Sequence, residues 1–226
     1  GLANRIASRF ADKIFISFEQ SKKFFPLDKV VYSGYPLRKN CFEKKREGII
    51  IGGINLDKID RPVLLATGGG NGSKLINDLV DRYRNDLEKK YLIIHQAGSS
   101  FIDEYKNLKS KDYLPLDFIP DFIEVLKRSK IIISRAGAGT VSELLAMKKK
   151  SIFIPLKIAQ KNEQYHNADE ARKKMGSIII KEDEVENSNL LELISKIDDE
   201  EFTPATEDKN PTDFLIEKIK LGLKSE

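Results

Sequence analysis

The sequence predicts an α/β fold, namely a Rossmann-like parallel sheet with helices on both faces. Short β-branched runs alternate with amphipathic stretches along the 226 residues, which is typical of βαβ units. The β-branched runs are continuously apolar, as buried parallel strands are. They are far shorter than the roughly 18–20 residues that span a bilayer.

These runs place the elements in chain order. We expect strands at residues 13–17, 30–33, 63–67, 91–96, 113–116, 131–134, 151–154 and 177–180. We expect helices at residues 4–10, 73–87, 103–108, 118–128, 139–147, 164–175, 188–196 and 211–223. The charged, glycine-containing residues 38–60 are typical of a linker, and the acidic residues 198–210 of a loop. Ligands of an open α/β sheet bind at the carboxyl ends of its strands, so a site is expected just after these strands.

Composition limits the classes of function. The net charge is +4, but acidic residues are interspersed and no basic run is interleaved with aromatics, so nucleic-acid binding is not favoured. Cys41 is the only cysteine, which rules out an internal disulfide and fits a reducing cytoplasm. The sequence contains no HExxH, CxxC or Asp-x-Asp pattern, so we expect no metal site. The two histidines, His95 and His166, are expected to be packed or solvated rather than catalytic.

A glycine-rich segment follows the expected strand at 63–67 and opens the next helix. Its members are Gly69, Gly70, Asn71, Gly72 and Ser73. Glycines allow a sharp turn and close approach to a ligand, and the N–H groups of a helix start favour a phosphate. The segment matches neither a Walker A loop nor a first GxGxxG turn. A tight strand–helix turn without any ligand is the alternative.

A second segment of small residues joins the strand at 131–134 to a helix. Its members are Arg135, Ala136, Gly137, Ala138, Gly139 and Thr140. Thr140 could cap the helix, and Glu143 is expected on the first turn, where its carboxylate could accept hydrogen bonds from ribose hydroxyls. A capping box between Thr140 and Glu143 is the alternative. Two such turns in one sheet favour a nucleotide site.

Two further segments offer groups for a sugar and a base. Glu163, Gln164 and Asn167 carry carboxylate and amide groups that suit sugar hydroxyls, although a polar helix start explains them too. Phe118 and Ile119 could offer an apolar wall and backbone groups to a base, or form a hydrophobic staple at a helix start.

Taken in order, these motifs resemble the bacterial MurG family, the GT-B enzymes that transfer N-acetylglucosamine (GlcNAc) from UDP-GlcNAc to undecaprenyl-pyrophosphoryl-muramoyl-pentapeptide. The resemblance covers most of residues 1–180. It is carried by residues 1–4, 11–13, 17–19, 34–38, 68–73, 118–119, 134–143, 153–155 and 163–168. The string from Ser134 to Glu143 is its most specific part.

The resemblance implies a UDP-GlcNAc site that needs no metal. Glu143 would hold the ribose, Ile119 would meet the uracil through its backbone, and the two turns would face the diphosphate. Gln164, and less securely Glu163, would contact the GlcNAc hydroxyls. The residues expected at the donor are Arg38, Gly69, Gly70, Asn71, Gly72, Ser73, Phe118, Ile119, Arg135, Ala136, Gly137, Ala138, Gly139, Thr140, Glu143, Glu163, Gln164 and Asn167.

The resemblance also implies a domain organisation. Residues 1–37 would be a remnant of the N-terminal acceptor domain, 38–60 a linker, 61–208 the donor-binding domain, and 209–226 a helix packing back toward the acceptor domain. Catalytic residues, the lipid-linked acceptor site and the membrane-facing patch are then expected outside this chain. The full protein would work in peptidoglycan synthesis, peripherally on the cytoplasmic face of the membrane. This fragment is expected to be inactive alone and could dimerise through its exposed remnant.

The sequence departs from the family pattern at two places. The usual Gly-Gly-Ser-Gln-Gly loop has Gly70 where a serine hydroxyl is expected, and the usual Gln-Gln pair begins with Glu163. Three alternatives share parts of the pattern: a donor-binding subunit of a two-chain GlcNAc transferase, a glycolipid glycosyltransferase, and a UDP-GlcNAc epimerase. The acceptor cannot be identified from donor motifs alone.

Overall fold

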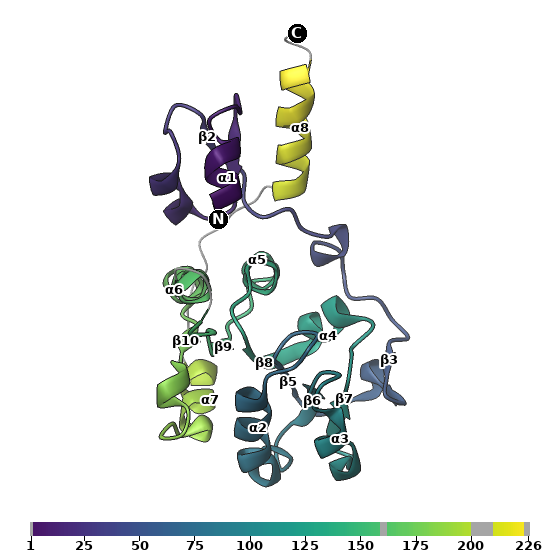
Figure 1. The fold of residues 1–226 in the computed structure, drawn as a ribbon. Helices are drawn as coiled ribbons and strands as arrows, with labels where there is room; N and C mark the ends of the chain where they lie inside the picture. The colour runs from purple at the N-terminus through teal and green to yellow at the C-terminus, as the bar shows by residue number, and fades with distance from the viewer. Residues whose placement is uncertain (1, 159–161, 200–209, 224–226) are drawn as a thin grey trace. The chain divides into compact units, whose positions relative to one another are not determined.

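The computed structural model describes residues 2–158, 162–199 and 210–223 and divides into two compact units. The smaller unit comprises residues 1–42 and 206–226, and the larger unit comprises residues 43–205. Figure 1 shows the helices and strands of both. No helix among the described residues is long and apolar enough to cross a membrane.

The larger unit is built on one sheet of six strands in the order β10-β9-β8-β5-β6-β7, in which every neighbouring pair is parallel. The strands are β5 (Val63–Thr67), β6 (Leu92–Gln96), β7 (Tyr113–Leu116), β8 (Ser129–Ser134), β9 (Ile152–Phe153) and β10 (Ile178–Ile179). β5 and β6 are buried at every residue, which explains their continuously apolar sequence. The predicted α/β fold class is confirmed.

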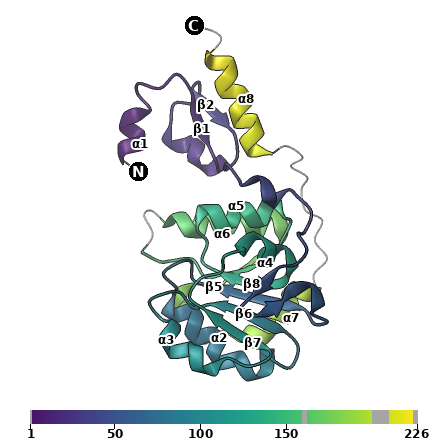
Figure 2. The same ribbon diagram turned by 90° about the vertical axis from the view of Figure 1, so that its right-hand side faces the viewer.

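Helices cover both faces of this sheet (Figure 2). They are α2 (Lys74–Leu87), α3 (Ile102–Tyr105), α4 (Phe122–Arg128), α5 (Ala138–Ala146), α6 (Glu163–Met175) and α7 (Leu190–Asp199), with short 3-10 turns η4 (Lys106–Leu108) and η6 (Glu182–Glu184). The chain runs from β5 outward to β7 and then returns to β8 on the other side of β5. Right-handed crossovers in opposite directions put α2 on one face and α5 on the other.

The main core lies between the sheet and the helices α2 and α7. Alternation along the strands sends Leu64 and Ala66 of β5 and Ile131 and Ile133 of β8 to this face. Apolar residues of the two helices meet them there, namely Ile76, Leu79, Val80, Leu87, Leu190, Ile194 and Ile197. The opposite alternation leaves Thr67 and Ser134, the last residues of β5 and β8, on the face covered by α4, α5 and α6.

Most predicted boundaries differ from the structure by a few residues, and three predictions need correction. The helix expected from residue 118 begins at Phe122, and the helix expected at 4–10 is α1 (Leu2–Ala7). The linker expected at 38–60 contains an antiparallel hairpin of β3 (Ile50–Ile51) and β4 (Ile54–Asn55), flanked by 3-10 turns η2 (Lys39–Cys41) and η3 (Leu56–Lys58). Of the loop predicted at 198–210, residues 200–209 lie outside the described residues.

A buried ion-pair cluster fixes the segment before the hairpin to α4. Glu124 is 1% exposed and accepts hydrogen bonds from the backbone N–H of Arg46 at 2.9 Å and from Lys127 and Arg128 at 2.8 Å each. Arg128 also pairs with Asp57 at 2.7 Å. Charged groups this deeply buried are stable only when paired, and this explains why so charged a segment is ordered.

The smaller unit contains the parallel pair β1 (Ile14–Ile16) and β2 (Val30–Tyr32), the 3-10 helix η1 (Glu19–Phe24), α1 and α8 (Pro211–Leu223). Its two chain segments are tied together at Leu37 and Thr212. The Leu37 N–H donates to the Thr212 hydroxyl, which donates back to the Leu37 carbonyl, both at 2.8 Å. These reciprocal bonds fix the start of α8 to the irregular segment that follows β2.

Candidate functional site

The two glycine-rich turns leave the sheet side by side. Thr67 and Ser134, the last residues of β5 and β8, are partners in the parallel register. The chain order reverses between these two strands, because β6 and β7 lie to one side and β9 and β10 to the other. Ligands of open α/β sheets bind in the crevice at such a switch point, so the sheet brings the two predicted turns to one place.

Both helices that follow these turns begin without a side-chain cap. The N-cap residue of α2 is Ser73 and that of α5 is Gly137, and neither makes a capping hydrogen bond. The N–H groups of a first helical turn have no partner within the helix. Two uncapped helix starts on neighbouring strands therefore suit an anion such as a diphosphate.

The expected capping role of Thr140 is wrong. The helix begins at Ala138, so Thr140 is its third residue, and a capping box with Glu143 cannot form. Glu143 lies on the second turn rather than the first, and its side chain is half-buried. The capping alternative for Glu143 is therefore excluded, and ribose binding by its carboxylate stays a prediction.

Four glycines in and around the two turns fall into two pairs. Gly72 has φ +83°, and a Cβ there would overlap the carbonyl oxygen of Ala97; a Cβ at Gly98, with φ +87°, would overlap the backbone of Gly72. Gly70 and Gly137 instead lack a positive φ, and a Cβ at either would meet nothing within 4 Å. Packing explains the first pair, whereas open space lies beside the second pair, next to the two helix starts.

A buried network behind the glycine turn is centred on His95, which is 0% exposed. The Tyr113 hydroxyl lies 2.8 Å from Nδ1 and donates to it, while Nε2 donates to Oδ1 of Asn77 at 3.0 Å. Asn77 Nδ2 in turn donates to the carbonyl of Ala97 at 3.0 Å, beside Gly72. Burial lowers the pKa of His95 to about 4, so this ring stays neutral and structural.

We expect His95 to make the fold acid-sensitive. The unfolded histidine binds a proton near its usual pKa of 6.5, whereas the folded one does so only near pH 4. Its contribution is therefore complete above pH 6.5 and is lost as the pH falls toward 4. Between pH 7 and pH 5 the free energy of unfolding should fall by about 2 kcal/mol from this residue.

Urea unfolding at several pH values measures this dependence. His95→Gln should flatten it over this range, and His166→Gln, at an exposed position, should leave it unchanged. An equally steep loss of stability in His95→Gln would show that other groups cause it.

The start of α6 holds the second turn in place. Oε1 of Gln164 accepts from the backbone N–H groups of Ala136 at 3.3 Å and Leu156 at 3.0 Å. Asn167 is 3% exposed and donates to the Ala136 carbonyl at 3.1 Å. Asn167 was expected among the ligand contacts, but its burial supports a role in positioning the turn. Glu163 is exposed at the first position of α6.

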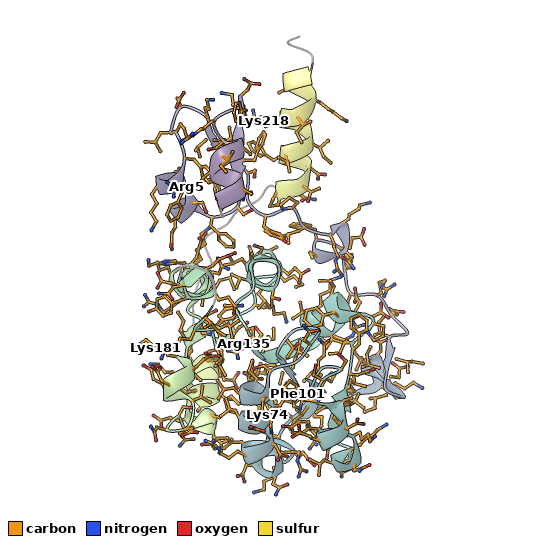
Figure 3. The ribbon with its side chains drawn as sticks, in the orientation of Figure 1. Arg5, Lys74, Phe101, Arg135, Lys181 and Lys218 are labelled. Atoms are coloured by element: carbon orange, nitrogen blue, oxygen red, sulfur yellow. The ribbon has the colours of Figure 1, made fainter. Side chains whose placement is uncertain are left out.

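The side chain of Arg135 is engaged within the protein. It pairs with Glu182 at 2.7 Å and donates to the carbonyl of Ile154 at 3.0 Å. Figure 3 labels it within the larger unit. The guanidinium is thus held against the ends of β9 and β10, and only the backbone of Arg135 keeps the predicted place in the turn that faces the diphosphate. Arg38, also expected at the donor, belongs to the smaller unit and its binding role stays a prediction.

Residues 117–121 form a loop in front of α4. Phe118 is 62% exposed, whereas Ile119 is 0% exposed. The backbone N–H of Ile119 donates to Oε1 of Gln96 at 3.2 Å, and Nε2 of Gln96 donates to the Gly69 carbonyl at 3.0 Å. Gln96 thus joins the two loops expected at the base and the diphosphate. Sequence reasoning missed it, although its place as the last residue of a buried strand was a usable signal.

A pocket of about 280 Å³ lies at the carboxyl ends of β9 and β10. It is lined by Pro155, Leu156, Lys157, Asn162, Tyr165, Lys181, Glu182 and Asp183. Its lysines pair with acidic neighbours, Lys157 with Asp183 at 3.3 Å and Lys181 with Glu184 at 3.1 Å. The pocket borders the second turn through Glu182 and contains none of the residues expected at the donor. In the part of the chain that the structure describes, no three acidic, histidine or cysteine residues are grouped to hold a metal.

The sheet order and its switch point define a Rossmann-like α/β unit. Residues 63–222 match the model of the glycosyltransferase family 28 C-terminal domain, and the chain belongs to that family.

Relatives with assigned names agree with this family. One from Clostridium botulinum strain Kyoto is 37% identical over 199 residues, covering 86% of this chain and 55% of its own length. It is named UDP-N-acetylglucosamine–N-acetylmuramyl-(pentapeptide) pyrophosphoryl-undecaprenol N-acetylglucosamine transferase. A relative from Bacillus cereus with the same name and the suffix 2 is 34% identical over 201 residues, covering 87% of this chain and 56% of itself. The chain therefore spans about half the length of the curated relatives it matches.

Solved structures share the fold. The crystal structure of Acinetobacter baumannii MurG matches with a TM-score of 0.64 at 23% identity, covering 98% of this chain and 63% of that one. The glycosyltransferase of kitacinnamycin matches with a TM-score of 0.60 at 11% identity, covering 92% of this chain and 50% of that one. The resemblance to MurG that the sequence motifs indicated is confirmed.

Proposed function

We propose that this chain is the donor-binding part of an inverting hexosyltransferase that moves GlcNAc from UDP-GlcNAc to a lipid-linked muramoyl-pentapeptide. The observation that carries the proposal is the pair of uncapped helix starts on the neighbouring strands β5 and β8. The names of the relatives supply the substrate classes, since these names contain UDP-N-acetylglucosamine and a pyrophosphoryl-undecaprenol acceptor.

The donor would lie across the two turns. Its diphosphate accepts hydrogen bonds from the first-turn N–H groups of α2 and α5, and the Glu143 carboxylate accepts from the ribose hydroxyls. The loop at Phe118 and Ile119 receives the base. Gln164 has its Oε1 engaged with Ala136 and Leu156, so its Nε2 is the group that reaches the sugar hydroxyls.

The chemistry assigned to these residues is stabilisation of the departing UDP. Negative charge grows on the diphosphate as the glycosidic bond breaks, and two helix starts fixed by the sheet oppose that charge without reorganising. We propose that no metal is needed for this step. The groups that activate the acceptor hydroxyl are assigned to the part of the full protein outside this chain.

Exposed apolar side chains of the smaller unit support two further proposals. Ile6, Phe10 and Leu27 are 52%, 84% and 73% exposed. We propose that a second protein surface covers them, by dimerisation of this chain, and that the full protein acts peripherally at the cytoplasmic membrane face. Light scattering tests the first: a monomer at all concentrations would rule out the dimer.

Calorimetry with UDP and UDP-GlcNAc tests the donor assignment. We expect saturable 1:1 binding of both ligands to the 226-residue chain, and no turnover of UDP-GlcNAc onto an acceptor. Folded protein that takes up neither nucleotide would contradict the proposal. GDP-mannose serves as the control, since it carries the same diphosphate with another base and sugar.

Gly70→Ser should raise the affinity for UDP. The position has room for a side chain and no positive φ, so serine fits without strain. Its hydroxyl lies in the first turn beside the expected diphosphate, and one added hydrogen bond contributes about 0.5–1.5 kcal/mol, or roughly 3- to 10-fold. Gly70→Ala is the matched control, which adds the Cβ but no hydroxyl and should leave the affinity unchanged. An affinity of Gly70→Ser equal to that of Gly70→Ala would mean that no phosphate approaches this residue.

A further inference from the structure

The last residue of β6, Gln96, touches both loops expected at the two ends of the nucleotide. Its side chain is almost fully buried and makes two hydrogen bonds, donating to the Gly69 carbonyl at 3.0 Å and accepting from the Ile119 N–H at 3.2 Å. Gly69 belongs to the diphosphate turn, and Ile119 belongs to the loop in front of α4. Gln96 therefore connects these two loops directly.

These two hydrogen bonds determine which way the peptide groups next to them point, because a peptide bond is planar. Every peptide bond among the described residues is trans, so the C=O and N–H of one peptide unit point in opposite directions. The Gly69 carbonyl points at Gln96 Nε2 and also accepts from the Gly72 N–H at 3.1 Å. The N–H of Gly70, in the same peptide unit, therefore points away from Gln96. A Cβ at Gly70 would meet nothing within 4 Å, so this residue borders open space.

The same argument applies to the second loop. The Ile119 N–H points at Gln96 Oε1, so the carbonyl of Phe118 points away from it. One buried amide thereby presents a hydrogen-bond donor from the diphosphate turn and an acceptor from the base loop. A glycine-rich turn has few side chains to fix its peptide planes, so an outside partner decides which way these groups face.

We infer that Gln96 is a positioning residue that sets the orientation and spacing of these two loops for a nucleoside diphosphate. The inference rests on the proposed donor site and goes beyond it, because Gln96 itself need not touch the ligand. The affinity of a ligand that contacts only one loop depends on only one of the two Gln96 hydrogen bonds, either the one from Nε2 or the one to Oε1. A ligand that reaches both loops depends on the whole side chain.

Two substitutions separate the halves. Gln96→Leu removes both hydrogen bonds, whereas Gln96→Glu has nearly the same shape, keeps an acceptor for Ile119 and loses the donor to Gly69. Ser129→Ala is the matched control, since it removes a buried side-chain bond to the Val125 carbonyl at the amino end of β8, away from both loops. Thermal unfolding of each variant accompanies the binding measurements.

The experiment compares the affinities of UDP, pyrophosphate and uridine for the full chain. Gln96→Leu should weaken UDP at least 10-fold and weaken each of the other two ligands. Gln96→Glu should weaken UDP and pyrophosphate at least 10-fold but leave uridine within twofold, and Ser129→Ala should leave all three within twofold. Loss of pyrophosphate together with retention of uridine in the single variant Gln96→Glu is the pattern that a general loss of stability cannot produce.

The outcomes separate the inference from the proposed function. If the wild-type protein binds UDP and the folded Gln96 variants bind it with an affinity within twofold of wild type, the positioning role alone is overturned. A UDP loss in Ser129→Ala equal to that in Gln96→Leu would also overturn it, because affinity would then follow stability. Folded wild-type protein that binds no UDP would overturn the donor site and this inference together.

Discussion

Gly72→Ala is expected to lower the free energy of unfolding by about 3–5 kcal/mol and to abolish UDP binding. The residue has φ +83°, and its Cβ would overlap the carbonyl oxygen of Ala97 and press on the ring of Phe101. Backbone strain of this kind costs about 1–3 kcal/mol, and overpacking about as much again. Lys74, two residues after Gly72, opens α2, so any shift of the turn also displaces that helix start.

Urea unfolding and calorimetry measure the two effects. Gly70→Ala, two residues earlier, provides the control, because the space there is open and alanine should keep or slightly raise stability. If the two alanine variants were equally stable, the close packing of Gly72 against the end of β6 would be refuted. If Gly72→Ala were destabilised but bound UDP normally, the turn would have no part in the donor site.

Glu143→Ala is expected to weaken UDP about 100-fold, close to 3 kcal/mol. A carboxylate that accepts two ribose hydroxyls loses two charge-assisted hydrogen bonds, each worth about 1.5–3 kcal/mol before overlap. The N-cap of α5 is Gly137, so Glu143 does not cap this helix, and alanine is the better helix former at an interior position. Loss of affinity therefore should not follow from loss of the helix.

Deoxynucleotides give the control for this prediction. Wild-type protein should discriminate against the 2′,3′-dideoxy analogue of UDP, and Glu143→Ala should bind UDP and the analogue equally. Discrimination that persists in Glu143→Ala would assign the ribose to another residue.

The sequence predicted the sheet because its strands are buried on both faces. Runs such as Val63–Thr67 carry no polar interruption, and only a parallel sheet with helices on both sides accepts them. The neighbour relation of β5 and β8 was less accessible, since strand order depends on the direction of each crossover. The family resemblance, rather than the runs themselves, pointed to a shared crevice.

Two of the boundary errors had a local signal. Pro120 keeps the preceding residue out of the helical region, so the helix expected from 118 could not begin before it. Gly52 and Gly53, with φ +54° and +90°, lie between Ile51 and Ile54 and form the two-residue turn of the hairpin β3–β4.

The sequence predicted the two turns but not the side chains that hold them in place. Small residues at strand ends mark where a backbone can approach a ligand, so residues 69–73 and 135–140 were predicted as candidate contacts. The inward hydrogen bonds of Asn167, Arg135 and Gln96 depend on contacts between distant segments, which one sequence does not reveal. The same amide that suits a sugar hydroxyl also suits a backbone carbonyl.

Backbone amide chemical shifts during a UDP titration test the shared diphosphate site most directly. We expect both turns to respond together, with one dissociation constant. The amides that should shift are those of Gly70, Asn71, Ala138, Gly139 and Thr140. Shifts confined to one of the two helix starts, or to neither while UDP binds elsewhere, would contradict it.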